Sequence, residues 1–198
     1  MPAKPFSQAC ENNKAAILTV LQAHLRDATR VLEIGSGTGQ HAIFFAEHLP
    51  HLHWQTSDLA EHHAGIREWL KEFPRPNLLS PLTLNVATSL WDFGSFDGVF
   101  TANTLHIMAW DEVLAMLDGV AKVLCPQGKL VIYGPFNYRG QFTSPSNARF
   151  NEWLQAQAPH RAIRDFDALC AAASARGLRW LDDIEMPANN RCLVFVRD

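Results

Sequence analysis

The chain has 198 residues, of which 47% are hydrophobic and 19% charged, and its formal net charge is −3 with histidine neutral. This length and composition are typical of one globular domain with a sizeable core, and we expect a single domain over residues 1–198. No block of lysine and arginine stands out, which argues against nucleic acid as a partner. No apolar run approaches membrane-spanning length and the N-terminus has no apolar signal region, so we expect a cytoplasmic protein without a membrane partner. The four cysteines are far apart and form no C-x-x-C pair, which disfavours a metal site.

The first predicted element is a helix over residues 7–25. Its apolar residues fall at helical spacing, and Ser7 is a plausible N-cap. Glu11, Asn12 and Asn13 come before the apolar stripe and are rich in hydrogen-bonding groups. The residues alone leave two interpretations open: a solvated first turn, which is the simpler one, and a role in binding a ligand.

A strand, a glycine turn and a helix follow, with the sequence R-V-L-E-I-G-S-G-T-G-Q from Arg30 to Gln40. The strand is predicted over residues 30–34 and the helix over residues 40–49, an arrangement typical of the start of a nucleotide-binding βαβ unit. Glycines let the backbone approach a ligand closely, and the helix N-terminus offers unpaired N–H groups. A dinucleotide motif would have a glycine where this chain has Gln40, so the spacing disfavours NAD. An ordinary glycine turn without a ligand is the alternative.

A second strand is predicted over residues 53–57, and it ends in Asp58. An acid at the end of this strand, about 20 residues after the glycine turn, can accept hydrogen bonds from both ribose hydroxyls of an adenosine group. The alternative is that Asp58 caps the next helix, predicted over residues 60–73. His62 and His63 lie on that helix and point in different directions, so we expect a solvated face and no shared metal.

The rest of the chain continues the alternation of strands and helices. Asp97 begins a strand, so it would lie at the opposite edge of the sheet from the strand ends, and we assign it to structure. Asp111 is a candidate helix cap. Residues 74–81 are predicted as a loop, and the polar, turn-rich stretch within residues 135–160 is either a lid or an ordinary surface excursion. Further strands are predicted at residues 82–86, 96–101, 129–133, 178–184 and 191–196, and further helices at residues 111–124, around 150–154 and at 165–176.

Polar residues gather after the predicted strands. In an open parallel sheet the carboxyl ends of the strands share one edge, and ligands bind beyond that edge. The segments that follow strand ends are the glycine turn, Asp58, residues 85–86, residues 103–106 and residues 134–147. The sequence therefore predicts a single site at this edge.

Several motifs resemble those of known S-adenosylmethionine (SAM) methyltransferases. Glu33 and the glycines after it form E-x-G-x-G-x-G, which resembles motif I of the class I superfamily. F-D-G-V-F-T-A-N-T-L-H and L-x-P-x-G-x-L-V-I resemble the fourth-strand and fifth-strand segments of the same superfamily. Within it, the chain resembles the small methyltransferase-like protein 26 family. The segments that carry this finer resemblance are A-C-E-N-N-K, V-L-E-I-G-S-G-T-G-Q-H, N-T-L-H-I, Y-G-P-F and T-S-P-S-N.

The resemblance implies an α/β fold: a Rossmann-like, seven-stranded, mostly parallel sheet with helices on both faces and an antiparallel C-terminal strand pair. It also implies SAM as the cofactor. Many members of the superfamily have an acid near the end of the third strand that accepts from the adenine amino group. Asn85 stands there in this chain, and its amide oxygen can accept the same bond. The residues expected to contact the cofactor are Glu33, Gly35, Ser36, Gly37, Gly39, Asp58, Asn85, Val86 and Asn103.

His106 is the one candidate for a general base, because a histidine pKa suits proton transfer near neutral pH; a structural histidine is the alternative. The resemblance makes residues 1–28 a helical cover of the active site and residues 135–160 a candidate lid. The expected reaction is methyl transfer to a small molecule. The alternatives are a SAM-binding sensor or partner subunit without turnover, and a NAD-dependent oxidoreductase, which Gln40 disfavours. The candidate contacts of the small molecule are Glu11, Asn12, Asn13, Tyr138, Asn147 and Arg149.

Overall fold

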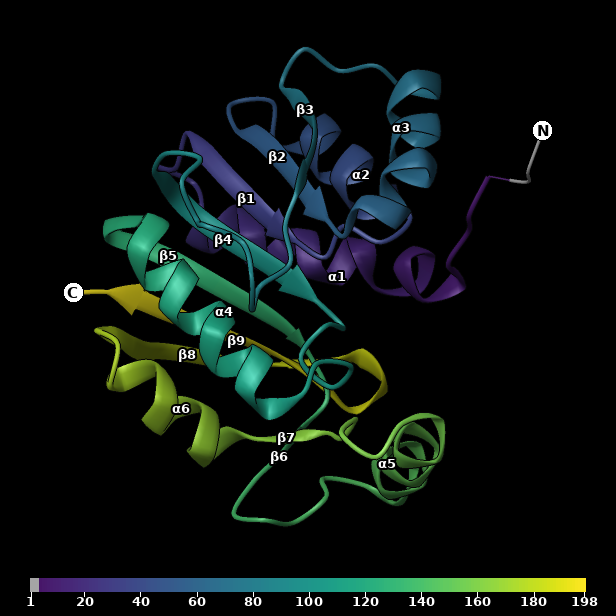
Figure 1. Ribbon diagram of the computed structural model, residues 1–198, viewed down its shortest axis with the longest axis vertical. Helices are drawn as coiled ribbons and strands as arrows, with labels where there is room; N and C mark the ends of the chain where they lie inside the picture. Colours follow the sequence, from purple (N-terminus) through teal and green to yellow (C-terminus); the bar gives the residue numbers. More distant parts are fainter. Residues whose placement is uncertain (1–3) are drawn as a thin grey trace.

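The centre of the protein is a seven-stranded sheet, seen in a computed structural model that describes residues 4–198 (Figure 1). The strand order is β3-β2-β1-β4-β5-β9-β8, and within the described residues only β9 runs antiparallel to its neighbours in this sheet. The predicted fold class, with its antiparallel C-terminal pair, is confirmed. The strands are β1 (Arg30–Ile34), β2 (His53–Asp58), β3 (Leu78–Thr83), β4 (Phe96–Ala102), β5 (Leu124–Gly134), β8 (Leu178–Met186) and β9 (Asn190–Arg197), and a separate two-stranded sheet joins β6 (Phe136–Asn137) and β7 (Arg164–Asp165).

Helices cover both faces of the sheet. They are α1 (Gln8–His24), α2 (Gln40–His48), α3 (His63–Glu72), α4 (Trp110–Val123), α5 (Pro145–Gln157) and α6 (Phe166–Ser174), with short 3-10 helices η1 (Ala60–His62) and η2 (Pro187–Asn189). Each predicted helix is therefore present, with ends shifted by a few residues. No helix of the described chain is long and apolar enough to cross a membrane.

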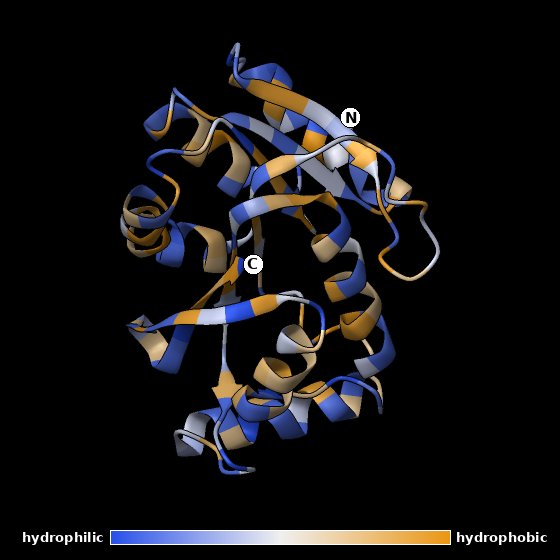
Figure 2. Ribbon diagram, turned by 90° about the vertical axis from the view of Figure 1, so that its left-hand side faces the viewer, coloured by the Kyte–Doolittle hydropathy of each residue, from blue (hydrophilic) through white to orange (hydrophobic). Residues whose placement is uncertain are grey.

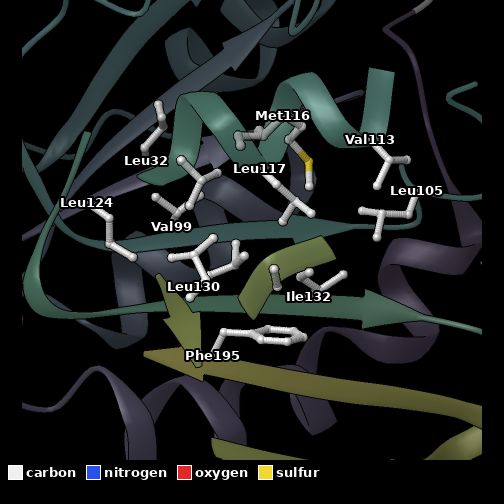
Figure 3. Close-up of a cluster of buried hydrophobic side chains, with 14 of the residues drawn as sticks. Leu32, Val99, Leu105, Val113, Met116, Leu117, Leu124, Leu130, Ile132 and Phe195 are labelled. Atoms are coloured by element: carbon white, nitrogen blue, oxygen red, sulfur yellow. The ribbon is translucent and has the colours of Figure 1, made fainter. Parts of the chain in front are cut away.

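Two hydrophobic cores lie on the two faces of the sheet. Neighbouring residues of a strand point to opposite faces, so Val31 and Val131 pack with α1 and α2, whereas Leu32 and Leu130 pack with α4 and α6. Figure 3 shows the second core, with Leu117 of α4 lying over the central strands. Hydrophobic and hydrophilic residues alternate along the helices (Figure 2), as expected for helices with one buried face.

Two helix starts show how local sequence sets the helix ends. Ser7 caps α1 as predicted, because its Oγ accepts from the backbone N–H of Cys10. The prediction that Asp111 caps its helix was wrong. The helix α4 begins one residue earlier, and the Glu112 side chain accepts from the backbone N–H of Ala109.

Asp97 lies at the start of β4, at the edge of the sheet opposite the strand ends. Its Oδ2 accepts from the backbone N–H of Thr29 at 2.8 Å, from the Thr29 hydroxyl at 2.6 Å and from the Arg30 N–H at 2.9 Å. Three hydrogen bonds to one oxygen lower the pKa of this carboxyl, although burial works against them. The structural assignment of Asp97 is confirmed.

The third strand is not where the sequence placed it. The prediction was residues 82–86 after a loop at 74–81, whereas β3 runs from Leu78 to Thr83 and contains Pro81. Proline cannot donate to a ladder and suggests a loop, but β3 is the outermost strand of the sheet, where one side of the backbone needs no partner. The residues after β3 are consequently free to form a turn at the carboxyl edge.

The strand order reverses between β1 and β4, because the chain builds outward from β1 to β3 and then returns to the other side of β1. Ligands of such sheets bind at this reversal, beyond the carboxyl ends of the strands. In Figure 1 the arrowheads of β1, β2, β4 and β5 point to the same edge, with the start of α1 nearby.

Candidate functional site

Three glycines of the loop after β1 have positive φ angles, in the left-handed region of the Ramachandran plot. The φ angles are 70° at Gly35, 56° at Gly37 and 91° at Gly39, values that favour glycine. A Cβ at Gly35 would lie 2.6 Å from Thr104 Cγ2, and one at Gly39 would lie 3.3 Å from Ile66 Cα. A Cβ at Gly37 would meet nothing within 4 Å. The outer glycines therefore pack the loop against the protein, while the backbone at Gly37 faces open space where a ligand can approach.

Glu33 and Ser36 hold this loop from beneath. Glu33 is 2% exposed, and its Oε2 accepts from Ser36 Oγ at 2.8 Å and from Trp54 Nε1 at 3.1 Å. Ser36 Oγ in turn accepts from the backbone N–H of Ser57 at 3.1 Å, so it ties the loop to β2. Burial raises the pKa of Glu33 to about 7, against these two hydrogen bonds, and the charge of Asp58 adds to the rise. Both side chains thus bind protein partners, and the backbone N–H and C=O of Ser36 are also bonded within the protein, to Ser57 O and to the Gly39 N–H.

Asp58 lies beside the glycine loop and is 8% exposed. Its Oδ2 accepts from the backbone N–H of Gly37 at 2.7 Å, and its Oδ1 accepts from the backbone N–H of Leu59 at 2.7 Å. Nδ1 of His62 lies 2.6 Å from the same Oδ1. The carboxylate therefore fixes the loop, the start of the following helical segment and a histidine together.

The expectation of a solvated face was right for His62, which is exposed, and wrong for His63. His63 is buried, with Nε2 at 3.1 Å from the backbone oxygen of Asp58. His62 is half exposed, but its ring is held by Asp58. Sequence periodicity could not find this contact, because Asp58 precedes the helix and reaches His62 only through the turn that η1 forms.

Asn85 and Val86 lie in the turn after β3, next to Asp58, whose backbone oxygen accepts from the N–H of Leu84 at 2.9 Å. Asn85 Oδ1 accepts from the backbone N–H of Ala87 at 3.0 Å, so the amide oxygen already stabilises the turn. Val86 is partly buried against the core beneath α4. The second lone pair of the amide oxygen is the acceptor that Asn85 has left for a ligand.

Asn103 and His106 follow β4 and lie beside Gly134 at the end of β5. Asn103 has a φ of 58°, and its backbone N–H donates to Tyr133 O at 2.9 Å. A Cβ at Gly134 would lie 3.9 Å from both Asn103 Oδ1 and His106 Nδ1. Because Gly134 has no side chain, the amide of Asn103 and the imidazole of His106 both lie close to the backbone at the end of β5.

The His106 ring is 6% exposed and packs edge-on against Phe150 of α5, with ring centroids 5.3 Å apart. Within the described residues, neither of its ring nitrogens has a hydrogen-bond partner. Burial lowers the pKa of His106 to about 4, and the positive charges of Arg164 and Arg161 lower it further. The imidazole is therefore neutral near pH 7 and has one nitrogen free to accept a proton.

Two residues were not among the individual candidates predicted from the sequence: Arg161, whose charge acts on His106, and Asn137. Arg161 Nε and Asn137 Oδ1 are buried atoms without a partner among residues 4–198, which marks them as groups that a ligand could satisfy. The neighbour of Arg161, Ala162, donates its N–H to His106 O at 3.1 Å. Arg161 belongs to no recognisable motif, so no signal in the sequence pointed to it. Asn137 lies in the polar segment 134–147 that was expected at the site, but nothing in the sequence distinguished it from its polar neighbours.

The start of α1 packs on the start of α2, next to the glycine loop. Gln40 Nε2 donates to Glu11 Oε1 at 2.6 Å, and His41 Nε2 lies 2.7 Å from Asn13 Oδ1. Burial lowers the pKa of His41 to about 4, so the ring is neutral and donates to the Asn13 amide oxygen. Asn12 is exposed and accepts from Gln8 of its own helix. The structure thus brings Glu11 and Asn13 to the loop and leaves Asn12 on the outer face of α1.

The remaining candidate contacts lie within or before α5. The Tyr138 hydroxyl donates to Asp183 Oδ2 at 2.7 Å, and burial raises the pKa of that hydroxyl. Asn147 is buried, and its amide donates to the backbone oxygen of Asn189 at 3.1 Å. Arg149 is exposed. The hydrogen bonds of Tyr138 and Asn147 therefore attach the segment to β8 and to η2, and the structure does not bring these three residues to the glycine loop.

Two surface cavities lie away from this edge. One of about 310 Å³ lies beside α3 and β3, with Arg67, Lys71 and Arg75 in its lining, and one of about 180 Å³ lies at the opposite edge, near Asp97 and Lys129. Neither includes a residue of the glycine loop. Within residues 4–198, no group of three or more His, Cys, Asp or Glu side chains lies close enough to hold a metal ion.

Residues 4–197 match the model of the family described as "Protein of unknown function (DUF938)", so the chain belongs to that family. Several solved structures with a similar fold are described as methyltransferases. An O-methyltransferase family 2 protein from Planctomyces limnophilus, in complex with apigenin, superimposes with a TM-score of 0.83 at 15% identity over 96% of this chain and 58% of that one.

Two further structures give the same result. An O-methyltransferase family protein from Burkholderia thailandensis has a TM-score of 0.78 at 16% identity, over 93% of this chain and 58% of that one. Human N-acetylserotonin methyltransferase in complex with SAM has a TM-score of 0.75 at 14% identity, over 100% of this chain and 60% of that one. The chain thus spans less than two thirds of each of these proteins, and it has the fold of SAM-dependent methyltransferases.

Proposed function

We propose that this protein is a SAM-dependent methyltransferase that acts on a small-molecule acceptor, as the resemblance to the methyltransferase-like protein 26 family suggests. The observation that carries the proposal is the pairing of Gly37 and Asp58. A backbone that faces open space is bonded to a nearly buried carboxylate, at the reversal of strand order in a methyltransferase fold. These are the two groups that an adenosine with an amino-acid tail needs: room for close approach and an acceptor for ribose hydroxyls.

The residues at this edge have the chemical groups that the ribose, the adenine and the methionine part of SAM each require. Asp58 would accept from the ribose, while Asn85 and Val86 in the adjacent turn would contact the adenine. The backbone from Gly35 to Gly39 would lie against the methionine part, with Glu33 holding the loop in place, and Asn103 would contact the cofactor from the end of β4. SAM supplies an electrophilic methyl group on a sulfonium centre.

His106 is the residue that we propose as the general base. Its neutral imidazole has a free nitrogen, so it can take the proton of an acceptor hydroxyl as that oxygen attacks. Its pKa of about 4 makes it a weak base in the protein alone. An anionic acceptor between His106 and Arg161 would raise that pKa by placing negative charge beside the ring.

Segments from both halves of the chain would exclude water from the reaction. We propose one domain over residues 1–198, in which the segment predicted at 1–28 covers the cofactor side and residues 135–160 close the acceptor side; residues 1–3 of the first segment lie outside the described residues. Phe150 of α5 already contacts the His106 ring, and Glu11 of α1 contacts Gln40 beside the loop. Holding the acceptor in line with the S–CH3 bond in a dry site is the main contribution that such residues make.

A SAM-binding protein without turnover is the second candidate. Two observations favour it: no carboxylate is hydrogen-bonded to the His106 ring in the described chain, and the Asn85 amide oxygen is engaged in its own turn. An unoriented base would support turnover poorly. Incubation with methyl-labelled SAM and a metabolite extract separates the two candidates, since a silent binder consumes no cofactor.

Calorimetric titration with S-adenosylhomocysteine tests the binding step. Asp58→Asn should weaken binding by about tenfold or more, because a hydrogen bond to a charged group contributes about 1.5–3 kcal/mol. Asp118→Asn is the matched control, since Asp118 is a carboxylate paired with Arg176 on the far side of α4. Unchanged affinity in Asp58→Asn, or binding of NADH in place of S-adenosylhomocysteine, would contradict the proposal.

A further inference from the structure

The side chain of His62 hydrogen-bonds to the Asp58 carboxylate and so fills one of its acceptor positions. Its Nδ1 lies 2.6 Å from Asp58 Oδ1, and its side chain is 48% exposed. The same carboxylate accepts from the backbone N–H groups of Gly37 and Leu59, both at 2.7 Å. An ionised carboxylate offers about four lone-pair positions. Three of them are filled in this structure, so one remains.

A ribose with two hydroxyls needs two acceptor positions, so one of the three present donors has to leave. The N–H groups of Gly37 and Leu59 belong to the backbone, and moving either would displace the glycine loop or the end of β2. The His62 ring can leave by rotation about its own side-chain bonds, and its exposed half is already in contact with water. His62 is therefore the donor whose release changes the site least.

We propose that His62 is a positioning residue of the cofactor site: it holds the Asp58 carboxylate in the free protein and releases it when a ribose diol binds. This inference rests on the proposed function, because it takes Asp58 to be the acceptor for the ribose. It makes His62 a competitor of the cofactor. The affinity of the wild-type protein is then lower than that of a protein in which Asp58 has only its backbone partners.

Calorimetric titration of the full chain with S-adenosylhomocysteine tests the inference. His62→Ala should bind about three- to tenfold more tightly than wild type, which is the range expected for loss of one competing hydrogen bond. His62→Asn places an amide nitrogen where Nδ1 lies, so it should restore an affinity near that of wild type.

His51→Ala is the control, because His51 is an exposed histidine in the turn before β2. It should bind S-adenosylhomocysteine with the wild-type affinity. Equal or weaker binding by His62→Ala, together with weakened binding by Asp58→Asn, would overturn the role of His62 and leave the cofactor assignment standing. If the wild-type protein fails to bind S-adenosylhomocysteine, the proposed function and this inference both fall. Thermal melting of each variant beforehand shows that it is folded.

Discussion

Replacing Glu33 with glutamine should change how the stability of the protein depends on pH. Burial of the Glu33 carboxyl raises its pKa from the usual 4.5 to about 7. Because the folded pKa lies above the unfolded one, the folded protein keeps the proton in a pH range where the unfolded chain has lost it. Stability contributed by the protonated group is fully present below pH 4.5 and is lost as the pH rises to about 7. At ~1.4 kcal/mol for each pKa unit, the whole effect is about 3 kcal/mol.

Glutamine keeps an oxygen that can accept from Ser36 and Trp54, the two partners of Glu33, and it does not titrate. Between pH 5 and pH 8 the wild-type protein should therefore lose about 2 to 3 kcal/mol of unfolding free energy relative to Glu33→Gln. Urea unfolding of both proteins at the two pH values measures the difference, and groups common to both cancel.

Glu68→Gln on the exposed face of α3 is the matched control, and its unfolding free energy should follow that of wild type at both pH values. Parallel pH profiles for wild type and Glu33→Gln would refute the reasoning. They would mean that the Glu33 carboxyl is hydrated in the folded protein.

Three further predictions follow from the geometry. Gly35→Ala should destabilise the protein by about 2 kcal/mol, since a Cβ there lies 2.6 Å from Thr104 Cγ2 and φ is 70°; adding Thr104→Ser removes that methyl and should restore part of the melting temperature. His106→Ala should keep the affinity for S-adenosylhomocysteine within about twofold and lower turnover by about a hundredfold or more, measured with labelled SAM; unchanged turnover would make His106 structural. Asp97→Asn should cost about 1–2 kcal/mol at pH 7 through its weakened hydrogen bonds to Thr29 and Arg30. The lowered pKa of Asp97 means that this cost shrinks as the pH falls through it, which acid titration of both proteins would show.

Local patterns were sufficient for most of the elements. The turn at residues 35–39 needs left-handed backbone, which glycine alone adopts without strain, so strand, turn and helix followed from residues adjacent in sequence. The cap at Ser7 is equally local, because its partner is the N–H of Cys10. The position of the third strand was predicted wrongly because it depends on tertiary structure. Whether Pro81 is tolerated depends on β3 being at the edge of the sheet, and no neighbouring residue carries that information.

The sequence predicted which residues follow the strand ends at the candidate site, but it did not predict the contacts between their side chains. Gly37, Asp58 and His106 follow predicted strands, and parallel strands bring their carboxyl ends together. The contact of His62 with Asp58 and the unpaired Nε of Arg161 depend on turn geometry and packing. The ligand contacts of Tyr138 and Asn147 stay predictions. The structure adds their protein partners, which come from β8 and from η2 after it.

The sequence by itself determined the order of strands and helices, the glycine loop and the acid beyond the second strand, because periodicity and backbone preferences act over a few residues. Only the tertiary structure decided which polar groups remain free. Most buried donors and acceptors are satisfied by whichever partner lies within hydrogen-bonding distance, and that partner can come from a distant segment of the chain, as Gly37 does for Asp58. For that reason the sequence could place Asp58 at the site, while the three groups that already occupy its carboxylate became visible only in the fold.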